Sequence, residues 1–205
     1  MRVSIIGQGY VGLTISAFAA AVHEVVGFDR NQKVVDQLNS GISHIEGVES
    51  EVLAKWIKAG RYKATTNGAD IKGSDIVVIA VPTPLTKDRK PDMSFIESAC
   101  KTIAENIDQP VLIINESTSF PGTVRNFIKP LVEKLSTNKF EHEYAISPER
   151  VDPGRGDYNQ KNTPRLYAGL TPEASEKTRE FYSSFCDELV EVSSPEVAES
   201  AKLDR

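Results

Sequence analysis

The sequence is poor in cysteine, in net positive charge and in long apolar runs, and each shortage argues against a class of protein. Its 205 residues include two cysteines, Cys100 and Cys186, which offer neither a disulfide framework nor a CxxC metal site. The formal net charge of -5 argues against a nucleic-acid surface, which usually needs a basic stripe. The apolar stretches are too short to span a bilayer, and the N-terminus reads directly into a strand, not a signal peptide. We therefore expect a cytoplasmic protein with no metal, nucleic-acid partner or membrane segment.

What the sequence does contain is an alternation of predicted strands and helices. The strands are expected at 3–6, 25–29, 62–65, 75–81, 111–115, 144–146, 165–168 and 189–192. The run at 75–81, DIVVIAV, is nearly continuous and typical of a central parallel strand covered on both faces. Because parallel strands need crossover helices, the pattern predicts an α/β fold with a Rossmann-like, doubly wound and mainly parallel sheet.

Helices are expected between these strands, one in the apolar, Ala-rich segment between the first two strands and others at 32–39, 49–59, 94–107, 121–135 and 172–185, and a last one begins after Ser194. Asp92 is the predicted N-cap of the helix at 94–107, and Pro121 stands where the next helix would start. The carboxyl ends of parallel strands are where ligands bind in such sheets. The loops that follow the strands are therefore the places to look for function.

The first of these loops is a glycine turn, GQGYVG at 7–12, and the second strand ends in Asp29. In dinucleotide-binding turns one glycine makes the bend, one lets amides approach a pyrophosphate, and one lets the helix pack closely. The acid lies near the expected ~20-residue offset for a ribose 2′-OH partner and favours NAD over NADP, although Arg30 softens that preference. An alternative is a βαβ unit whose glycines serve only packing. The cofactor residues predicted here are Gly7, Gly9, Tyr10, Val11, Gly12, Asp29 and Arg30.

Three later loops also follow predicted strands: VPTP at 81–84, ESTSFPGT at 116–123 and SPERVDPG at 147–154. Each has a structural explanation by itself. Prolines such as Pro82 can end a strand, Ser and Thr commonly cap helices, and Glu149 with Arg150 can form an exposed ion pair. Together, however, the loops would place hydroxyls and a carboxylate at the face where a nicotinamide would lie. That agreement favours a functional site.

These loops also carry a resemblance. GQGYVGL at 7–13, VPTP, ESTSFPGT, SPERVDPG and AESAKL at 198–203 stand in the order seen in the nucleotide-sugar 6-dehydrogenases, the UDP-glucose/GDP-mannose dehydrogenase family. The resemblance covers essentially the whole chain. The PERVDPG form is more similar to the UDP-N-acetylhexosamine branch than to the UDP-glucose branch, where the segment more often reads PEFL.

The resemblance implies a two-step oxidation of a UDP-sugar C6 alcohol to a carboxylate with two NAD. In the family, a cysteine captures the intermediate aldehyde, the adduct is oxidised to a thioester, and water releases the acid. Pro82 and Thr83 would join the cofactor residues, and Thr118 would lie near the nicotinamide and position the water. Glu149 would transfer protons during hydrolysis, and Lys202 would stabilise the oxyanion. The implied substrate-binding residues are Glu149, Arg150, Val151 and Lys202.

The family's nucleophilic cysteine lies in a glycine-rich motif of a second, C-terminal domain. Neither Cys100 nor Cys186 has such a flanking pattern, and we expect both to be buried or incidental. We therefore expect the NAD-binding half of such an enzyme, truncated and incomplete by itself, with residues 1–194 as the NAD-binding domain. Residues 195–205 would begin a central dimerisation helix, which by itself is short enough to fray. The full-length form is expected to be a homodimer.

Two other functions stay open at this point. One is a non-catalytic nucleotide-binding or assembly module that pairs with a separate subunit. The other is a different NAD-dependent dehydrogenase, of the 3-hydroxyacid or 6-phosphogluconate type, which shares the Rossmann unit. The second alternative does not explain SPERVDPG or AKL at their places.

Overall fold

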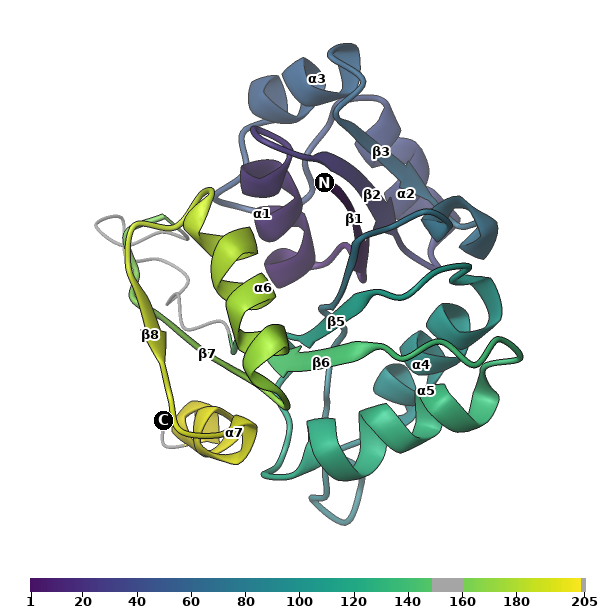
Figure 1. The fold of residues 1–205 in the computed structure, drawn as a ribbon. Helices are drawn as coiled ribbons and strands as arrows, with labels where there is room; N and C mark the ends of the chain where they lie inside the picture. Colours follow the sequence, from purple (N-terminus) through teal and green to yellow (C-terminus); the bar gives the residue numbers. More distant parts are fainter. Residues whose placement is uncertain (149–160, 204–205) are drawn as a thin grey trace.

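A computed structural model of the chain describes residues 1–148 and 161–203. Within them, eight strands form one sheet in the order β3-β2-β1-β4-β5-β6-β7-β8 (Figure 1). All neighbouring strands are parallel except β6 and β7, which are antiparallel. The strands are β1 (Arg2–Ile6), β2 (Glu24–Phe28), β3 (Tyr62–Thr65), β4 (Ile76–Ile79), β5 (Leu112–Asn115), β6 (Glu143–Ile146), β7 (Arg165–Gly169) and β8 (Leu189–Glu191). The expected Rossmann-like, mainly parallel sheet is confirmed.

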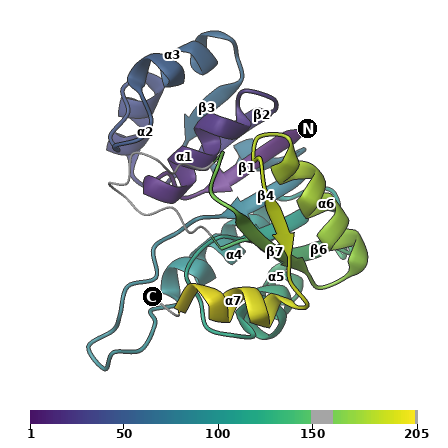
Figure 2. The same ribbon diagram turned by 90° about the vertical axis from the view of Figure 1, so that its left-hand side faces the viewer.

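Helices connect the strands as the alternating pattern predicts (Figure 2). In the described residues they are α1 (Tyr10–Ala19), α2 (Gln32–Asn39), α3 (Ser50–Lys58), α4 (Ser94–Asn106), α5 (Lys129–Leu135), α6 (Pro172–Ser183) and α7 (Pro195–Leu203). A short 3-10 turn, η1 (Gly68–Ile71), precedes β4, and a π-helical turn, η2 (Val124–Ile128), leads into α5. None of the helices in the described part of the chain is long and apolar enough to cross a membrane.

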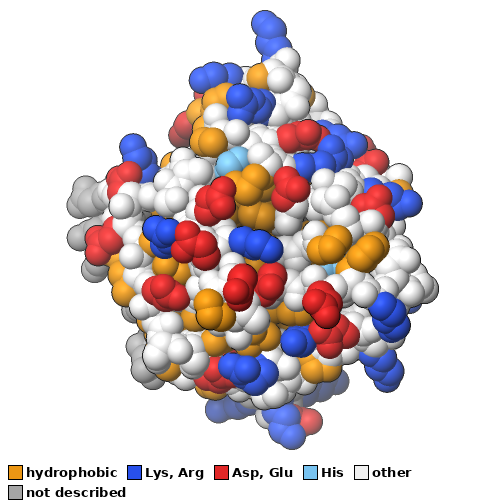
Figure 3. All heavy atoms as spheres, viewed as in Figure 1, with side chains coloured by type: hydrophobic (Ala, Val, Ile, Leu, Met, Phe, Trp, Pro, Cys, Tyr) orange, Lys and Arg blue, Asp and Glu red, His pale blue; other side chains and the backbone are white. Residues whose placement is uncertain are grey.

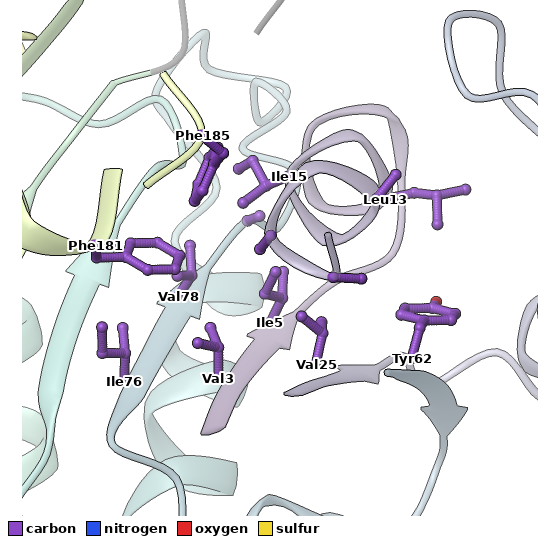
Figure 4. Close-up of a cluster of buried hydrophobic side chains, with 14 of the residues drawn as sticks. Val3, Ile5, Leu13, Ile15, Val25, Tyr62, Ile76, Val78, Phe181 and Phe185 are labelled. Atoms are coloured by element: carbon purple, nitrogen blue, oxygen red, sulfur yellow. The ribbon is translucent and has the colours of Figure 1, made fainter. Parts of the chain in front are cut away.

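The sheet is buried on both faces because its central strands are apolar at every position. Along β4, Ile76 and Val78 pack on one face and Val77 and Ile79 on the other. The first face is covered by α1 and α6, and Figure 4 shows Val78 near Phe181 of α6 on this side. The second face is covered by α4 and α5. This two-sided burial is what a doubly wound sheet requires.

Acidic and basic side chains are interspersed on the face of the molecule shown in Figure 3. No stripe of one sign crosses this face, as expected from a chain with a modest net charge.

Two helix starts differ from the sequence-based expectation. The N-cap of α4 is Met93, not Asp92, although the Asp92 carboxylate still accepts a hydrogen bond from the Ser94 backbone N–H at 3.0 Å. The helix expected from Pro121 begins later, with the π turn at Val124. Gly122 has φ +90°, which a right-handed helix cannot include. The turn around Gly122 therefore delays the helix.

Candidate functional site

The glycine turn lies between β1 and α1, and its three glycines are constrained differently. A Cβ on Gly7 would lie 2.4 Å from the Ala80 carbonyl oxygen, and Gly7 has φ +95°. A Cβ on Gly12 would lie 1.8 Å from the Gly7 carbonyl oxygen. A Cβ on Gly9 would meet no described atom within 4 Å. Gly7 and Gly12 thus permit close packing, whereas Gly9 leaves open the approach to the start of α1, where N–H groups without intrahelical partners favour an anion.

Asp29 directly follows β2 and is joined to the glycine turn. Its carboxylate accepts hydrogen bonds from the backbone N–H groups of Gln8 and Asn31, both at 2.9 Å. These bonds fix the carboxylate beside the turn. The neighbouring Arg30 donates to the Ser98 hydroxyl of α4 at 3.2 Å, so its guanidinium joins the end of β2 to helix α4.

A cavity of about 370 Å³ lies between the glycine turn, the end of β2 and helix α4. This volume is in the range of small-ligand sites. Its predicted members are Gly7, Gly9, Asp29, Arg30 and Pro82. The sequence reasoning missed its α4 wall, which is made by Phe95, Ser98, Ala99 and Thr102. Their spacing of three and four residues marks one helix face, which is the signal that could have found them.

A second cavity, of about 220 Å³, shares Gly9, Val81 and Pro82 with the first. It brings together motifs that are far apart in the sequence. Its walls come from the glycine turn, from the loops after β4 and β5, and from α7. The predicted residues that line it are Gly9, Tyr10, Val11, Pro82, Thr83, Thr118 and Lys202. Four further residues that were not predicted complete the lining: Ala80, Val81, Glu116 and Ser117.

Hydrogen bonds hold the walls of this second cavity. The Thr83 hydroxyl donates to the Thr118 carbonyl oxygen at 2.7 Å, and the Val81 backbone N–H donates to the Ser117 hydroxyl at 2.9 Å. The loops after β4 and β5 are therefore tied together. Lys202 of α7 donates to the Glu116 carbonyl oxygen at 2.9 Å, so its ammonium group lies at the loop that carries Thr118.

The Glu116 side chain anchors the same loop to β7 and α6. It is fully buried, and one of its oxygens accepts hydrogen bonds from Arg165, at 2.6 Å, and from the Tyr182 hydroxyl. The Arg165 guanidinium also lies over the Tyr182 ring, 4.4 Å from its centre. Burial alone would lower the pKa of Arg165, but the adjacent carboxylate outweighs it and the net shift is upward. Sequence reasoning missed this cluster, because nothing local links 116, 165 and 182.

Helix α7 is docked by Glu199, one turn before Lys202. The Glu199 carboxylate is buried and accepts from the backbone N–H groups of Gly122 and Val124, the latter at 3.0 Å. These donors lie at the start of η2, so a side chain from α7 caps the helix that follows the Thr118 loop. Glu196 adds an ion pair with Arg125 at 2.7 Å. The last helix, expected to fray alone, is held by contacts within this chain.

Three of the predicted substrate residues, Glu149, Arg150 and Val151, lie outside the described residues. Cys100 and Cys186 are both buried, as expected. Burial raises the pKa of the Cys100 thiol to about 12 and also raises that of Cys186, so neither is a ready thiolate. The described ranges contain no group of three His, Cys, Asp or Glu side chains arranged to hold a metal.

The fold and these cavities define a dinucleotide-binding protein of the Rossmann class, with a glycine turn at a helix N-terminus and an acid after the second strand. Within the Rossmann class, the sequence of the chain identifies one family. Residues 1–186 match the UDP-glucose/GDP-mannose dehydrogenase family, NAD binding domain, and the chain belongs to this family. The predicted cofactor, NAD, is thereby confirmed.

The similar proteins agree with this assignment. The chain is 35% identical to the UDP-N-acetyl-D-mannosamine dehydrogenase of Pyrococcus horikoshii, over 99% of this chain and 49% of that protein. The structure of that enzyme superimposes with a TM-score of 0.89. A ternary complex of GDP-mannose dehydrogenase from Pseudomonas aeruginosa gives a TM-score of 0.87 at 30% identity, over 99% of this chain and 48% of that one. The chain thus spans about half the length of the curated relatives it matches.

Proposed function

We propose that this chain is the NAD-binding half of a nucleotide-sugar 6-dehydrogenase, which oxidises the C6 alcohol of a UDP-sugar to a carboxylate with two NAD. The observation that carries the proposal is the position of Lys202. The last helix brings its ammonium group to the Glu116 carbonyl oxygen, into the cavity lined by Thr118 and by the glycine turn. A simple dinucleotide-binding module would not need a cation at that place.

The cofactor part of the proposal rests on the two neighbouring cavities, which share Gly9, Val81 and Pro82. The larger one, beside Asp29 and Arg30, suits the adenosine half of NAD, and the open face at Gly9 suits the pyrophosphate. The nicotinamide would then lie in the smaller cavity, near Thr83 and Thr118. Bound NAD supplies a hydride acceptor there. Tyr10, Val11 and Pro82 line the path, whereas Gly12 contributes by letting α1 pack against the turn.

The catalytic part assigns roles to three residues. Lys202 stabilises negative charge that develops on the substrate oxygen, since a fixed cation in a cavity is effective at this task. Thr118 orients a water molecule, and Glu149 exchanges protons with that water during thioester hydrolysis. Arg150, Val151 and Lys202 contact the sugar. The names of the relatives and the PERVDPG form favour a UDP-N-acetylhexosamine as the substrate.

We also propose that the chain binds NAD but does not complete the oxidation by itself, because both of its cysteines are buried and their thiol pKa values are raised. Calorimetric titration should show heat with NAD, and Asp29→Ala should weaken binding about tenfold through the lost ribose contact. A titration without heat for the unmodified chain would contradict NAD binding. Uronic acid formed from a UDP-sugar by the purified chain would contradict the proposal that the chain does not complete the oxidation by itself.

The remaining elements of the proposal concern assembly and location. Residues 1–194 form the NAD-binding domain, and residues 195–205 begin a central helix through which the full-length form makes a homodimer in the cytoplasm. Light scattering on the full-length form should give the mass of two chains. A monomer that retains full activity would contradict the dimer.

A further inference from the structure

The residue between the first two glycines of the turn, Gln8, has an environment that the fingerprint does not account for. Its side chain is fully buried, which is unusual for glutamine. The amide nitrogen donates to the carbonyl oxygens of Ile5 and Gly7, both at 3.1 Å. The amide oxygen accepts from the Tyr62 hydroxyl at 2.9 Å and lies 3.1 Å from the Ser16 hydroxyl, whose single proton it shares with the Gly12 carbonyl oxygen at 2.8 Å. Each polar atom of the amide therefore has two partners within hydrogen-bond distance.

These bonds fix one particular peptide unit, the one that joins Gly7 to Gln8. Its carbonyl oxygen accepts from the Gln8 side chain, and its N–H donates to the Asp29 carboxylate at 2.9 Å. A rotation of this peptide plane would break both bonds. The plane directly precedes Gly9, the residue whose open face leads to the start of α1.

The surrounding structure is built around this amide. A Cβ on Gly27 of β2 would lie 2.5 Å from the Gln8 amide carbon and 2.8 Å from the Tyr62 hydroxyl, so only glycine leaves room for the pair. Burial raises the pKa of Tyr62, which keeps its hydroxyl protonated as a donor. The network thus links β1, α1 and β3 to the turn.

We propose that Gln8 is a positioning residue for the pyrophosphate of NAD: its amide, held by Tyr62 and Ser16, sets the turn so that Gly9 and the start of α1 receive the phosphates. Gln8 does not contact the cofactor in this proposal and acts through the Gly7–Gln8 peptide. The inference rests on NAD binding as proposed above.

The test compares ligands with and without a pyrophosphate. Gln8→Met keeps the approximate volume of the side chain and removes the hydrogen bonds of its amide. We expect it to weaken the binding of NAD and ADP-ribose by about tenfold, or about 1.4 kcal/mol. The affinity for adenosine, measured by NMR titration, should change by less than about twofold. Tyr62→Phe removes one donor, so it should show the same pattern with a loss of about threefold.

The matched control is Ser74→Ala. Ser74 is also fully buried and hydrogen-bonded, to the Ser4 hydroxyl at 2.7 Å, but it precedes β4, at the opposite end of the sheet. Removing the Ser74 hydroxyl should lower the free energy of unfolding without changing the affinity for ligands with or without a pyrophosphate. If Gln8→Met fails to fold, the same comparison of ligand affinities with Tyr62→Phe tests the proposal.

Two outcomes would overturn the proposal. One is a folded variant that binds NAD within about twofold of the unmodified chain. The other is an equal loss for adenosine and ADP-ribose, which would show a general structural role. If the unmodified chain binds no NAD, the proposed function fails and not this inference alone.

Discussion

Two loops meet in the smaller cavity, and they are held in place by different chemistry. The buried side chain that fixes the glycine turn after β1 is neutral, since the Gln8 amide accepts from the Tyr62 hydroxyl, and the Gln8 backbone N–H also donates to the half-buried Asp29 carboxylate. The loop after β5 is fixed by charges, since Glu116 pairs with Arg165 and Glu199 of α7 caps the helix that follows. The difference teaches that the buried side chains that hold the cofactor side are neutral, whereas those that hold the side carrying Thr118 and Lys202 are ionised.

The loop after β5 also depends more strongly on its buried charges, because each ion of its pair needs the other. Arg165 is 4% exposed and Glu116 is fully buried, so both ions have lost most of their hydration. One Glu116 oxygen, Oε2, has no hydrogen-bond partner in the described part of the chain. Burial, and next the Glu116 charge, raise the pKa of Tyr182, so this phenol remains a donor. Removing one ion would leave the other uncompensated, which is worse than removing both.

The largest effect is therefore expected from Arg165→Met. It should lower the free energy of unfolding by about 3–5 kcal/mol, because Glu116 would be left as an isolated buried carboxylate. Urea unfolding followed by circular dichroism measures the change. Arg179→Met, which breaks only the exposed pair with Glu176, should stay within about 0.5 kcal/mol. The double variant Glu116→Gln/Arg165→Met should recover part of the loss. A loss below about 1 kcal/mol in Arg165→Met would contradict the argument.

On the neutral side, Gly12→Ala should come next. Its Cβ would lie 1.8 Å from the Gly7 carbonyl oxygen, so the helix must shift, at about 1–3 kcal/mol of unfolding free energy. Gly9→Ala is the matched control, because a Cβ there meets no described atom within 4 Å. It should leave stability within about 1 kcal/mol and weaken NAD binding in calorimetry. Equal stability losses in the two variants would show that the turn does not separate packing from ligand approach.

A smaller effect is expected from Glu199→Ala, which leaves the N–H groups of Gly122 and Val124 without their acceptor. The loss should be about 1–2 kcal/mol, as for other helix caps, and concentrated at α7. Hydrogen exchange should show faster exchange in α7 with little change in α1. Ser200→Ala, on the same helix at an exposed position, should change neither. Uniform acceleration through the whole sheet would argue against a local role in docking.

The smallest effect is a pH dependence from the pair of Glu196 and Arg125. The hydrogen bond from Arg125 holds the pKa of Glu196 down at about 2. A lowered carboxyl pKa adds stability that is present above the unfolded value near 4.5 and is lost as the pH falls toward 2. Because the pair is partly exposed, we expect only a few tenths of a kcal/mol. Urea unfolding at pH 7 and pH 3, with Arg125→Gln as the variant that loses this slope, measures it.

Glu199 should act in the opposite direction on the same helix. Burial raises its pKa, although the N–H groups of Val124 and Gly122 oppose the shift. A group whose folded pKa is raised favours the folded state at low pH, and this contribution is lost as the pH rises through the folded pKa. Arg125→Gln and Glu199→Ala should therefore change the slope of stability against pH with opposite signs.

Local patterns were sufficient for the whole order of strands and helices, for the glycine turn and for Asp29. An apolar run such as DIVVIAV, a glycine turn and an acid at a set offset act through neighbours in the sequence, so they can be read directly. The ends of the helices were less accurate. The start expected at Pro121 moved because Gly122 adopts φ +90° and Glu199, 77 residues later, supplies the cap.

The partners of the buried polar side chains were decided only by the tertiary structure. Gln8, at the end of β1, reaches Tyr62 of β3 across the intervening strand β2, because the residue of β2 at this place is Gly27, which has no side chain. Glu116 meets Arg165 and Tyr182 because the sheet continues through β6 to β7. Lys202 reaches Thr118's loop because Glu199 docks α7. Long-range pairings leave no periodic signal in the chain, since a buried ion pair needs only that its two members meet after folding. Local sequence patterns therefore determine the dinucleotide-binding fold, whereas tertiary packing decides which charged side chains lie beside the cofactor site.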